Sequence, residues 1–267
     1  MSSLSKLMNM SGRRALITGA AGGLGRVMSE TLAEMGADLV LVDLPASALS
    51  AQAKDLVRQH GINVQVEYCD LEYSAQREEL AKQVLGNGRV LNVLINNAAF
   101  VGTSGLQGWS EPFEKQTIEA WRRALEVNLT SVFHLCQLFT EALRESRSGS
   151  VINIASIYGE YGPDWSLYEG TSMANPAAYG ASKGGVIQFT RWLATTLGPD
   201  VRANVISPGG VARGQPDSFV EQYKSRTPLK RMAAEDDFRG TTAYLAGDMS
   251  SYVTGQVLRV DGGWGVW

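Results

Sequence analysis

Short apolar runs alternate with longer amphipathic stretches along almost the whole chain, and this alternation limits the possible folds more than any other feature. The apolar runs are rich in β-branched residues and are bounded by Gly, Asp or Asn, which is typical of strands covered on both faces. Strands that alternate with helices form a parallel sheet with right-handed crossovers. The predicted strands are 15–18, 39–42, 64–69, 90–95, 151–155, 203–206 and 257–260, and the predicted helices are 24–35, 47–60, 74–85, 117–143 and 177–197.

We interpret residues 1–267 as a single α/β domain, a doubly wound parallel sheet of seven strands with helices on both faces. A chain of 267 residues with 44% hydrophobic content can bury one large core. No repeat, low-complexity segment or linker interrupts the pattern. The stretches 159–175 and 213–232 are expected to be excursions from this scaffold.

The composition excludes several functions and suggests a compartment. The formal net charge is -3, so no basic excess points to nucleic acid or to an anionic membrane. Residues 1–14 lack the apolar core of a signal peptide, and no run is long enough to span a membrane, which favours the cytoplasm. Cys69 and Cys136 are expected to be buried, reduced thiols. His60 and His134 have no neighbours at metal-ligand spacing, so we expect no metal site.

A glycine-rich turn, Thr18-Gly-Ala-Ala-Gly-Gly-Leu-Gly25, joins the first predicted strand to the first predicted helix. Glycines let the backbone approach a pyrophosphate, and the free amides at the start of a helix attract the anion. Gly25 would let the helix pack closely on the strand. The glycines alone are also consistent with a plain tight turn, but their place between strand and helix favours a nucleotide site.

Acidic residues end the second and third predicted strands. A carboxylate at Asp43 can accept hydrogen bonds from both ribose hydroxyls of an adenosine and would repel the extra phosphate of NADP. The residues directly after Asp43 include no Arg or Lys that could bind this phosphate, so the sequence favours NAD over NADP. The alternative is that Asp43 only caps a turn or a helix. Asp70 and Leu71, after the third strand, are placed to reach the adenine edge.

A tyrosine and a lysine, Tyr179 and Lys183, lie four residues apart at the start of a predicted helix, hence on one face. A neighbouring ammonium and an oxidised nicotinamide would both favour the phenolate and lower the pKa of the tyrosine. Such a tyrosine can exchange a proton with a substrate alcohol. Ser156, at the end of the fifth strand, is placed to hold the substrate oxygen. The plain alternatives are a solvated helix face and a turn serine.

Asn128 is a polar residue in an otherwise apolar helical stretch. A helix kink, a buried amide network or a proton relay would each explain it. Together with the residues above it completes an ordered set of motifs, which is Thr18-Gly-x-x-x-Gly-x-Gly25, Asn96-Asn-Ala-Ala99, Asn128, Ser156, Tyr179-x-x-x-Lys183 and Pro208-Gly209. This ordered set resembles the short-chain dehydrogenase/reductase family, and the resemblance extends from about residue 10 to residue 267.

The resemblance implies a Rossmann-type fold, a nicotinamide cofactor and a homo-oligomer, either a dimer or a tetramer, with residues 253–263 as last strand and subunit contact. It implies Tyr179 as general acid/base, Lys183 as its modulator and ribose ligand, Ser156 as orienter of the substrate oxygen, and Asn128 as holder of a relay water. Asn97 would steady the central strand, and the Pro208 turn would lie against the nicotinamide. The expected cofactor residues are Gly19, Gly22, Gly23, Leu24, Gly25, Asp43, Leu44, Asp70, Leu71, Asn97, Ala98, Ala99, Tyr179, Lys183, Pro208, Gly209 and Val211.

Three departures from the family pattern bear on the site. Ala99 replaces the usual glycine, which is tolerated if its backbone has negative φ. The segment between Ser156 and Tyr179 is unusually long, and it either lines the substrate pocket or forms a surface or interface loop. Arg213 stands where a threonine is expected, and it would bind the cofactor pyrophosphate or an anionic substrate group, or point to solvent.

Aromatic and acidic side chains in the long segment suit a polyhydroxylated substrate. The segment and the stretch Pro208-Gly-Gly-Val-Ala-Arg-Gly-Gln-Pro216 resemble family members of flagellin and surface-glycan sugar biosynthesis, which implies a sugar, amino sugar or sugar phosphate. The alternatives are a reductase of a 3-oxoacyl thioester or steroid-like ketone, and a non-catalytic NAD-responsive binding protein. The expected substrate residues are Tyr158, Trp165, Tyr168 and Arg213.

Overall fold

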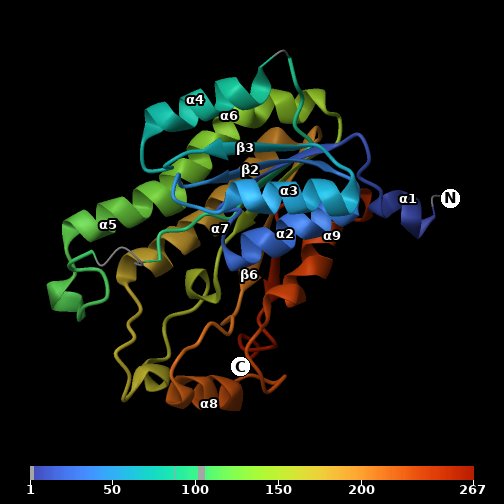
Figure 1. The fold of residues 1–267 in the computed structure, drawn as a ribbon. Helices are drawn as coiled ribbons and strands as arrows, with labels where there is room; N and C mark the ends of the chain where they lie inside the picture. The colour runs from blue at the N-terminus through green and yellow to red at the C-terminus, as the bar shows by residue number, and fades with distance from the viewer. Residues whose placement is uncertain (1–2, 87, 102–105) are drawn as a thin grey trace.

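The structure is a computed structural model that describes residues 3–86, 88–101 and 106–267. Its centre is a seven-stranded, all-parallel sheet in the order β3-β2-β1-β4-β5-β6-β7, as Figure 1 shows in part. The predicted doubly wound α/β fold is therefore confirmed. The strands are β1 Arg14–Thr18, β2 Asp38–Asp43, β3 Val64–Tyr68, β4 Val93–Asn96, β5 Gly149–Ile154, β6 Val201–Pro208 and β7 Val257–Val260.

Helices cover both faces of the sheet, and each face has its own apolar core. Alternation along β1 divides its side chains, because Leu16 belongs to one core and Ala15 and Ile17 to the other. One face carries α2 Gly23–Glu34, α3 Leu49–His60 and α9 Arg239–Ala246. The other carries α4 Ser74–Leu85, α5 Ile118–Leu125, α6 Ser131–Glu145 and α7 Ala177–Leu197 (Figure 1).

Several element boundaries differ from those predicted. The fourth strand begins at Val93 rather than at residue 90, because Val93 is the first residue that pairs with β1. β3 lies at the sheet edge, so its residues are half-buried or exposed rather than covered on both faces. The helix predicted over 117–143 is two helices, α5 and α6, joined by the π-helical turn Glu126–Thr130. The pattern missed α9, the short N-terminal helix α1 Leu4–Met8, and α8 Asp217–Arg226.

The two expected excursions lie together beyond the carboxyl ends of the strands (Figure 1). The stretch 159–175 follows the single turn η3 Ile157–Gly159 and contains η4 Trp165–Tyr168, while the stretch 213–232 contains α8. They share an aromatic core with Trp264 from the C-terminal segment. We call this assembly of residues 157–175, 213–232 and 261–267 the cap.

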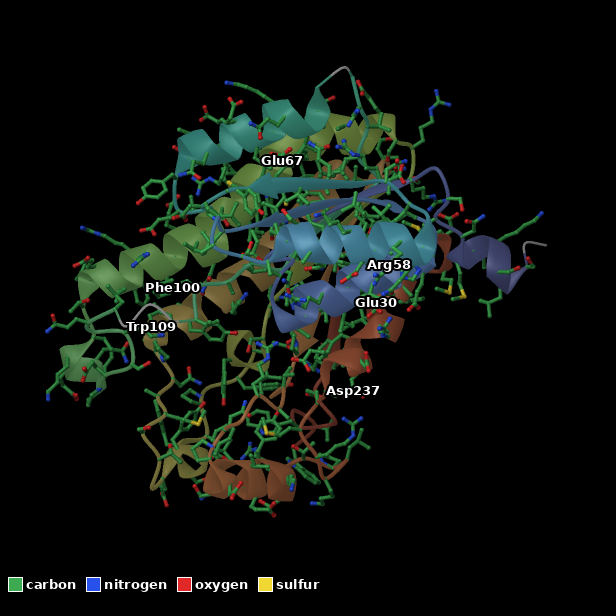
Figure 2. All side chains as sticks on the ribbon, viewed as in Figure 1. Glu30, Arg58, Glu67, Phe100, Trp109 and Asp237 are labelled. Atoms are coloured by element: carbon green, nitrogen blue, oxygen red, sulfur yellow. The ribbon has the colours of Figure 1, made fainter. Side chains whose placement is uncertain are left out.

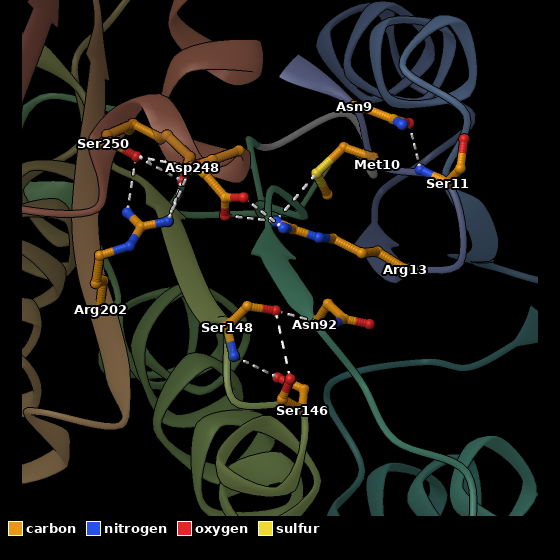
Figure 3. Close-up of polar contacts among 12 residues, drawn as sticks. Asn9, Met10, Ser11, Arg13, Asn92, Ser146, Ser148, Arg202, Asp248 and Ser250 are labelled. Carbon is orange, nitrogen blue, oxygen red and sulfur yellow. Dashed lines mark hydrogen bonds and ion pairs between the residues drawn. The ribbon is translucent and has the colours of Figure 1, made fainter. Parts of the chain in front are cut away.

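The amino ends of the strands are closed by polar contacts, which Figure 3 shows. Arg13 donates to both carboxylate oxygens of Asp248, over 2.8 and 2.6 Å. Arg202 donates to the Ser250 hydroxyl over 2.8 Å and to two carbonyl oxygens of the same segment. These side chains connect the starts of β1 and β6 to the segment at the end of α9. The polar residues at this edge of the sheet therefore stabilise the fold.

Among the described residues, no helix is long and apolar enough to cross a membrane, and no cluster of three His, Cys, Asp or Glu side chains is arranged for a metal ion. Cys69 and Cys136 are free and buried, as predicted. His134 lies on α6 and accepts a hydrogen bond of 3.0 Å from the guanidinium of Arg77.

Candidate active site

A cavity of about 610 Å³ lies at the carboxyl ends of the strands, beside the point where the strand order reverses between β1 and β4. Open α/β sheets bind ligands at this point. Predicted residues that line it are Gly19, Gly22, Gly23, Leu24, Asp43, Leu44, Asp70, Leu71, Asn97, Ala98, Ala99, Ser156, Tyr179, Lys183, Pro208, Gly209, Val211 and Arg213. The predicted residues outside its lining are Gly25, Asn128, Tyr158, Trp165 and Tyr168.

The glycine turn fits a phosphate because side chains are sterically excluded from it. Gly19 has a φ of +63°, and a Cβ there would lie 2.8 Å from Ala98 Cα. A Cβ on Gly25 would lie only 2.1 Å from Gly19 O, so Gly25 lies behind the turn and packs α2 against it. The N-terminus of α2 has no side-chain cap and no acidic residue in its first turn. Its free amides therefore face the cavity as an anion site.

Asp43 serves the turn as well as the cavity. Its Oδ2 accepts a hydrogen bond of 2.8 Å from Ala21 N, and its Oδ1 accepts one of 2.8 Å from Leu44 N. A carboxylate oxygen can accept more than one hydrogen bond, so these contacts leave capacity toward the cavity. Asp70 binds the Glu72 amide over 3.0 Å, and Glu72 in turn pairs with Arg123 over 2.8 Å beside the cavity.

Asn97 joins β4 to the glycine turn. Its Nδ2 donates to the carbonyl oxygens of Thr18 and Gly19, each over 3.0 Å. The Thr18 hydroxyl accepts from the amides of Asn97 and Ala98, each over 3.1 Å. These contacts fit the strand-steadying role implied for Asn97. Positive φ at non-glycine positions of the described chain occurs at Arg147 and Lys230, so Ala99 meets the condition for replacing glycine.

The Ser, Tyr and Lys side chains meet at one side of the cavity, where β5 ends and α7 begins. Ser156 is two residues beyond β5, and its Oγ accepts a hydrogen bond of 3.2 Å from Tyr158 N. Tyr179 is in the first turn of α7. The buried Lys183 Nζ donates to Ile154 O over 2.8 Å and lies 5.8 Å from the centroid of the Tyr179 ring. The hydrogen bond to Ile154 O thus anchors Lys183 to the end of β5 and holds its ammonium group near the Tyr179 ring.

The pKa values of the pair reflect burial. Burial raises the pKa of the Tyr179 phenol above its usual value, while the hydrogen bond with Ser156 and the charge of Arg213 act in the opposite direction. Burial also lowers the pKa of Lys183 to about 8. In the protein alone the tyrosine shift is therefore opposite to the one expected beside an oxidised nicotinamide.

Asn128 belongs to the π-helical turn between α5 and α6 and is completely buried. Its Oδ1 accepts from Phe100 N over 2.6 Å, and its Nδ2 donates to Phe100 O over 3.3 Å and to Ser182 Oγ over 3.2 Å. The side chain thus joins the loop after β4 to the turn of α7 that carries Tyr179. The helix is thus irregular at Asn128, whose buried amide is hydrogen-bonded on both sides, and π turns recur at functional sites. The relay water stays a prediction.

The long segment after Ser156 packs directly on the turn of α7 that carries Lys183. A Cβ on Gly159 would lie 2.7 Å from the carbonyl carbon of Lys183. The hydroxyls of Tyr158 and Tyr168 lie 2.7 Å apart, and Asn175 Nδ2 donates to the latter over 3.1 Å. Trp165 is different, because it is 59% exposed and its ring is tilted by 56° against that of Tyr168.

Arg213 does not simply point to solvent. It lines the cavity, and its Nε lies 3.2 Å from Glu235 Oε1. Sequence reasoning also missed part of the lining. Phe100 and Val101 follow directly after Asn96-Asn-Ala-Ala99, so the motif could have been used to predict them. Arg123 and Val127 come from α5 and the π turn, and no nearby motif in the sequence marks them as part of the site. The remaining missed residues are Ala21, Val42, Cys69, Glu72, Ile154, Ala155 and Gln215.

Comparison with known proteins places this geometry in a family. A family model described as enoyl-(acyl carrier protein) reductase matches residues 19–265. A tropinone reductase homolog of Arabidopsis thaliana is 33% identical over 98% of this chain and 95% of its own. The 3-oxoacyl-[acyl-carrier-protein] reductase FabG of Thermotoga maritima is 30% identical over 96% and 99%. The chain belongs to the short-chain dehydrogenase/reductase family. The family prediction is thereby confirmed, and with it the class of oxidoreductases.

Solved structures agree with this assignment. A gluconate 5-dehydrogenase from Burkholderia cenocepacia in complex with NADP and tartrate superposes with a TM-score of 0.86, at 26% identity, over 99% of this chain and 100% of its own. An NAD+-bound xylitol dehydrogenase gives 0.83 at 27% identity, over 95% and 99%. This short-chain dehydrogenase/reductase therefore shares its whole fold with enzymes that hold either nicotinamide dinucleotide.

Proposed function

We propose that this chain interconverts a secondary alcohol and a ketone with a nicotinamide dinucleotide as hydride carrier. One observation carries the proposal, which is that Tyr179, Lys183 and Ser156 line the same cavity as the glycine turn. The excluded side chains at Gly19 and Gly23 and the uncapped start of α2 fit the pyrophosphate of such a cofactor. The homo-oligomer and the cytoplasmic location stay predictions.

The protein's own share of the reaction is to hold the substrate oxygen and to move one proton. A bound nicotinamide supplies or accepts the hydride. Ser156 donates a hydrogen bond to the substrate oxygen, and Tyr179 gives its phenolic proton to that oxygen in reduction or takes it in oxidation. Lys183, held by Ile154 O, places a positive charge near the phenol and stabilises the phenolate when it forms.

Asp43 supports a preference for NAD over NADP. Its carboxylate lines the cavity and is fixed to the glycine turn by the Ala21 amide, so a phosphate on the adenosine ribose would meet an immobile negative charge. The solved relatives hold NADP in one case and NAD+ in the other.

The cap supports a polyhydroxylated substrate, such as a sugar, amino sugar or sugar phosphate. Tyr158, Tyr168 and Asn175 lie outside the cavity lining, but they form a connected set of donors and acceptors on the segment that follows Ser156 and packs against α7. Such a set can bind hydroxyl groups with defined geometry. Two solved relatives are named as gluconate 5-dehydrogenase and xylitol dehydrogenase, which act on compounds of this class.

A 3-oxoacyl thioester or another apolar ketone is the second candidate. The loop after β4 brings an apolar group to the cavity, because Phe100, which lines it, packs edge to face on Trp109 at 4.8 Å in a cluster that also includes Tyr179 (Figure 2). The relative from Thermotoga maritima is named as a 3-oxoacyl reductase. The polar insert on the opposite side favours the polyhydroxylated substrate.

Tyr179→Phe tests the mechanism. Removing the phenolic proton should lower turnover by about 10²–10⁴-fold, the usual contribution of a positioned acid or base, and weaken cofactor binding far less than that. Turnover is followed by NADH absorbance with a panel of sugars, polyols and a 3-oxoacyl thioester, and binding by calorimetric titration with NADH and NADPH.

Tyr252→Phe is the matched control, because Tyr252 is fully exposed and should be silent. Normal turnover in Tyr179→Phe would refute the mechanism. Tight NADH binding with no turnover of any substrate in the panel would favour the non-catalytic binding protein.

A further inference from the structure

Residues 210–213 and 231–237, which we call the cap base, form two segments that are joined beside the glycine turn. Val211 and Ala233 form a parallel bridge, in which Ala212 N donates to Ala233 O and Ala233 N donates to Gly210 O, each over 2.9 Å. The bridge carries Arg213 on one strand and Glu235 on the other. The bridge therefore brings these two side chains close together, and Arg213 Nε lies 3.2 Å from Glu235 Oε1.

The tip of this bridge lies against the first residue of α2. A Cβ built on Gly23 would lie 2.6 Å from Glu235 Oε1 and 3.1 Å from Arg213 Nη2. The first of these distances is closer than real Cβ atoms approach, so the glycine makes room for the carboxylate. The anion site at the start of α2 is thus already approached by an anion of the protein itself.

The charges explain why Glu235 settles there. α2 has no side-chain cap and no acidic residue in its first turn, so its positive end lacks an anionic partner within the helix. The Glu235 side chain is 30% exposed, and its pair with Arg213 neutralises it in part. Glu235 does not itself line the cavity, but Gly23 and Arg213, which it contacts, both do. A pyrophosphate held by the free amides of α2 would therefore lie beside this carboxylate and be repelled by it.

We propose that the Arg213–Glu235 pair is an internal occupant of the pyrophosphate site that sets cofactor affinity. When the dinucleotide binds, Glu235 leaves Gly23, and Arg213 exchanges the carboxylate for the pyrophosphate. Arg213 is thus a positioning residue for the cofactor, and Glu235 is a competitor that lowers its affinity. This inference rests on the proposed function, because it needs a dinucleotide in the cavity.

The exchange predicts an increase in affinity when the competitor is removed. A carboxylate that merely held Arg213 in its working position would give the opposite result, since its loss would weaken binding. A surface ion pair without a role would give no change, because exposed pairs contribute little. The sign of the change in Kd therefore distinguishes the three cases.

The experiment is calorimetric titration of the full chain with NADH and with ADP, which keeps the pyrophosphate group without the nicotinamide. Glu235→Gln should bind both about two- to fivefold more tightly than the wild type, the range expected for a charge at a helix end. Arg213→Met should bind both more weakly by a similar factor. Glu235→Asp, which withdraws the carboxylate from Gly23 by one methylene, should change affinity in the same direction as Glu235→Gln.

Glu221→Gln is the matched control, because it removes an exposed carboxylate from a pair with Lys224 on α8 and changes the net charge equally. Equal tightening in Glu221→Gln and Glu235→Gln would overturn the inference by making the effect one of net charge. Unchanged or weaker binding in Glu235→Gln would overturn it too, as would unchanged binding in Arg213→Met. Failure of the wild type to bind NADH would refute the proposed function itself.

Discussion

The glycine-turn side of the cavity and the cap differ in what holds them together. On the glycine-turn side, backbone groups make most of the contacts, as when Ala21 N binds Asp43 and the amides of Asn97 and Ala98 bind Thr18. These residues are fixed to the ends of neighbouring parallel strands. Their positions follow from the sheet register and do not depend on which substrate the protein binds.

The cap is held by side chains from segments far apart in the sequence. Tyr161 Oη donates to Gly265 O over 2.9 Å, and the Arg226 guanidinium lies 4.5 Å above the Trp264 ring while it also pairs with Asp164. These contacts connect the insert, α8 and the C-terminal segment. The difference teaches that the glycine-turn side depends on the backbone of the scaffold, whereas the cap depends on particular side chains and can change when they are replaced.

Trp264→Ala should separate the two sides most strongly. Trp264 is 2% exposed and packs against Tyr158, Tyr161 and Tyr223 in the cap. Truncating a buried Trp costs about 3–5 kcal/mol. We expect a large fall in kcat/KM for the substrate with an unchanged NADH affinity, measured by steady-state kinetics and calorimetry.

Trp264→Phe keeps the aromatic packing and serves as its control, with a smaller loss in both stability and kcat/KM. An equal loss of NADH affinity and of substrate turnover in Trp264→Ala would contradict the separation of the two sides.

Gly25→Ala should act on the other side. The added Cβ would lie 2.1 Å from Gly19 O and would force α2 away from the turn. Overpacking of this kind costs about 1–3 kcal/mol of stability. NADH affinity should fall at least about tenfold, equal to about 1.4 kcal/mol of binding free energy. Urea unfolding and calorimetric titration measure the two effects.

Gly240→Ala is the matched control, because Gly240 lies in α9 with no atom within 4 Å of an added Cβ. It should stabilise the protein by about 0.5–1 kcal/mol through helix propensity and leave binding unaltered. Wild-type affinity in Gly25→Ala would show that the turn tolerates a side chain there.

The same contrast explains what the sequence could predict. Gly19, Gly25 and Asn97 occupy places that only their residue types can fill, at offsets fixed by strand and helix lengths, so a linear pattern was enough to find them. The first and last residues of strand β7 and of helices α4 and α7 were predicted correctly, because residues that break the pattern flank these elements, such as Gly86 after α4 and Pro176 before α7.

The cap contacts could not be predicted in this way. Arg213 was identified as unusual, but its partner Glu235 is brought to it by a bridge across the excursion that contains α8. Trp264 joins Tyr158 and Tyr161 only in three dimensions. α8 was missed because its apolar residues, of which Phe219 and Tyr223 are buried, are too few to produce a strong helical pattern.

The smallest expected effect is a change in the stability of the fold at low pH. Arg231 and the Ala234 amide bind Asp237 at the cap base, and hydrogen bonds with these groups lower the pKa of this carboxyl to about 2 (Figure 2). A carboxyl whose pKa is lower in the folded state stabilises the fold above its unfolded pKa, which is about 4, and loses this contribution as the pH falls toward 2. The contribution should be small, because the pair lies near the surface.

Urea unfolding of Asp237→Asn therefore should show a modest loss of stability at pH 6 that disappears near pH 2. Asp236→Asn, one residue earlier on the same turn and paired with Arg239, is the control and should lose less at pH 6, because Asp236 receives no backbone amide from Ala234. NADH affinity of Asp237→Asn at pH 6 should match the wild type, since Asp237 does not line the cofactor cavity. If the variant were still less stable than the wild type by the same amount at pH 2, the charge of the carboxylate would not be what stabilises the cap base. The packing of the Asp237 side chain would then be the stabilising contribution.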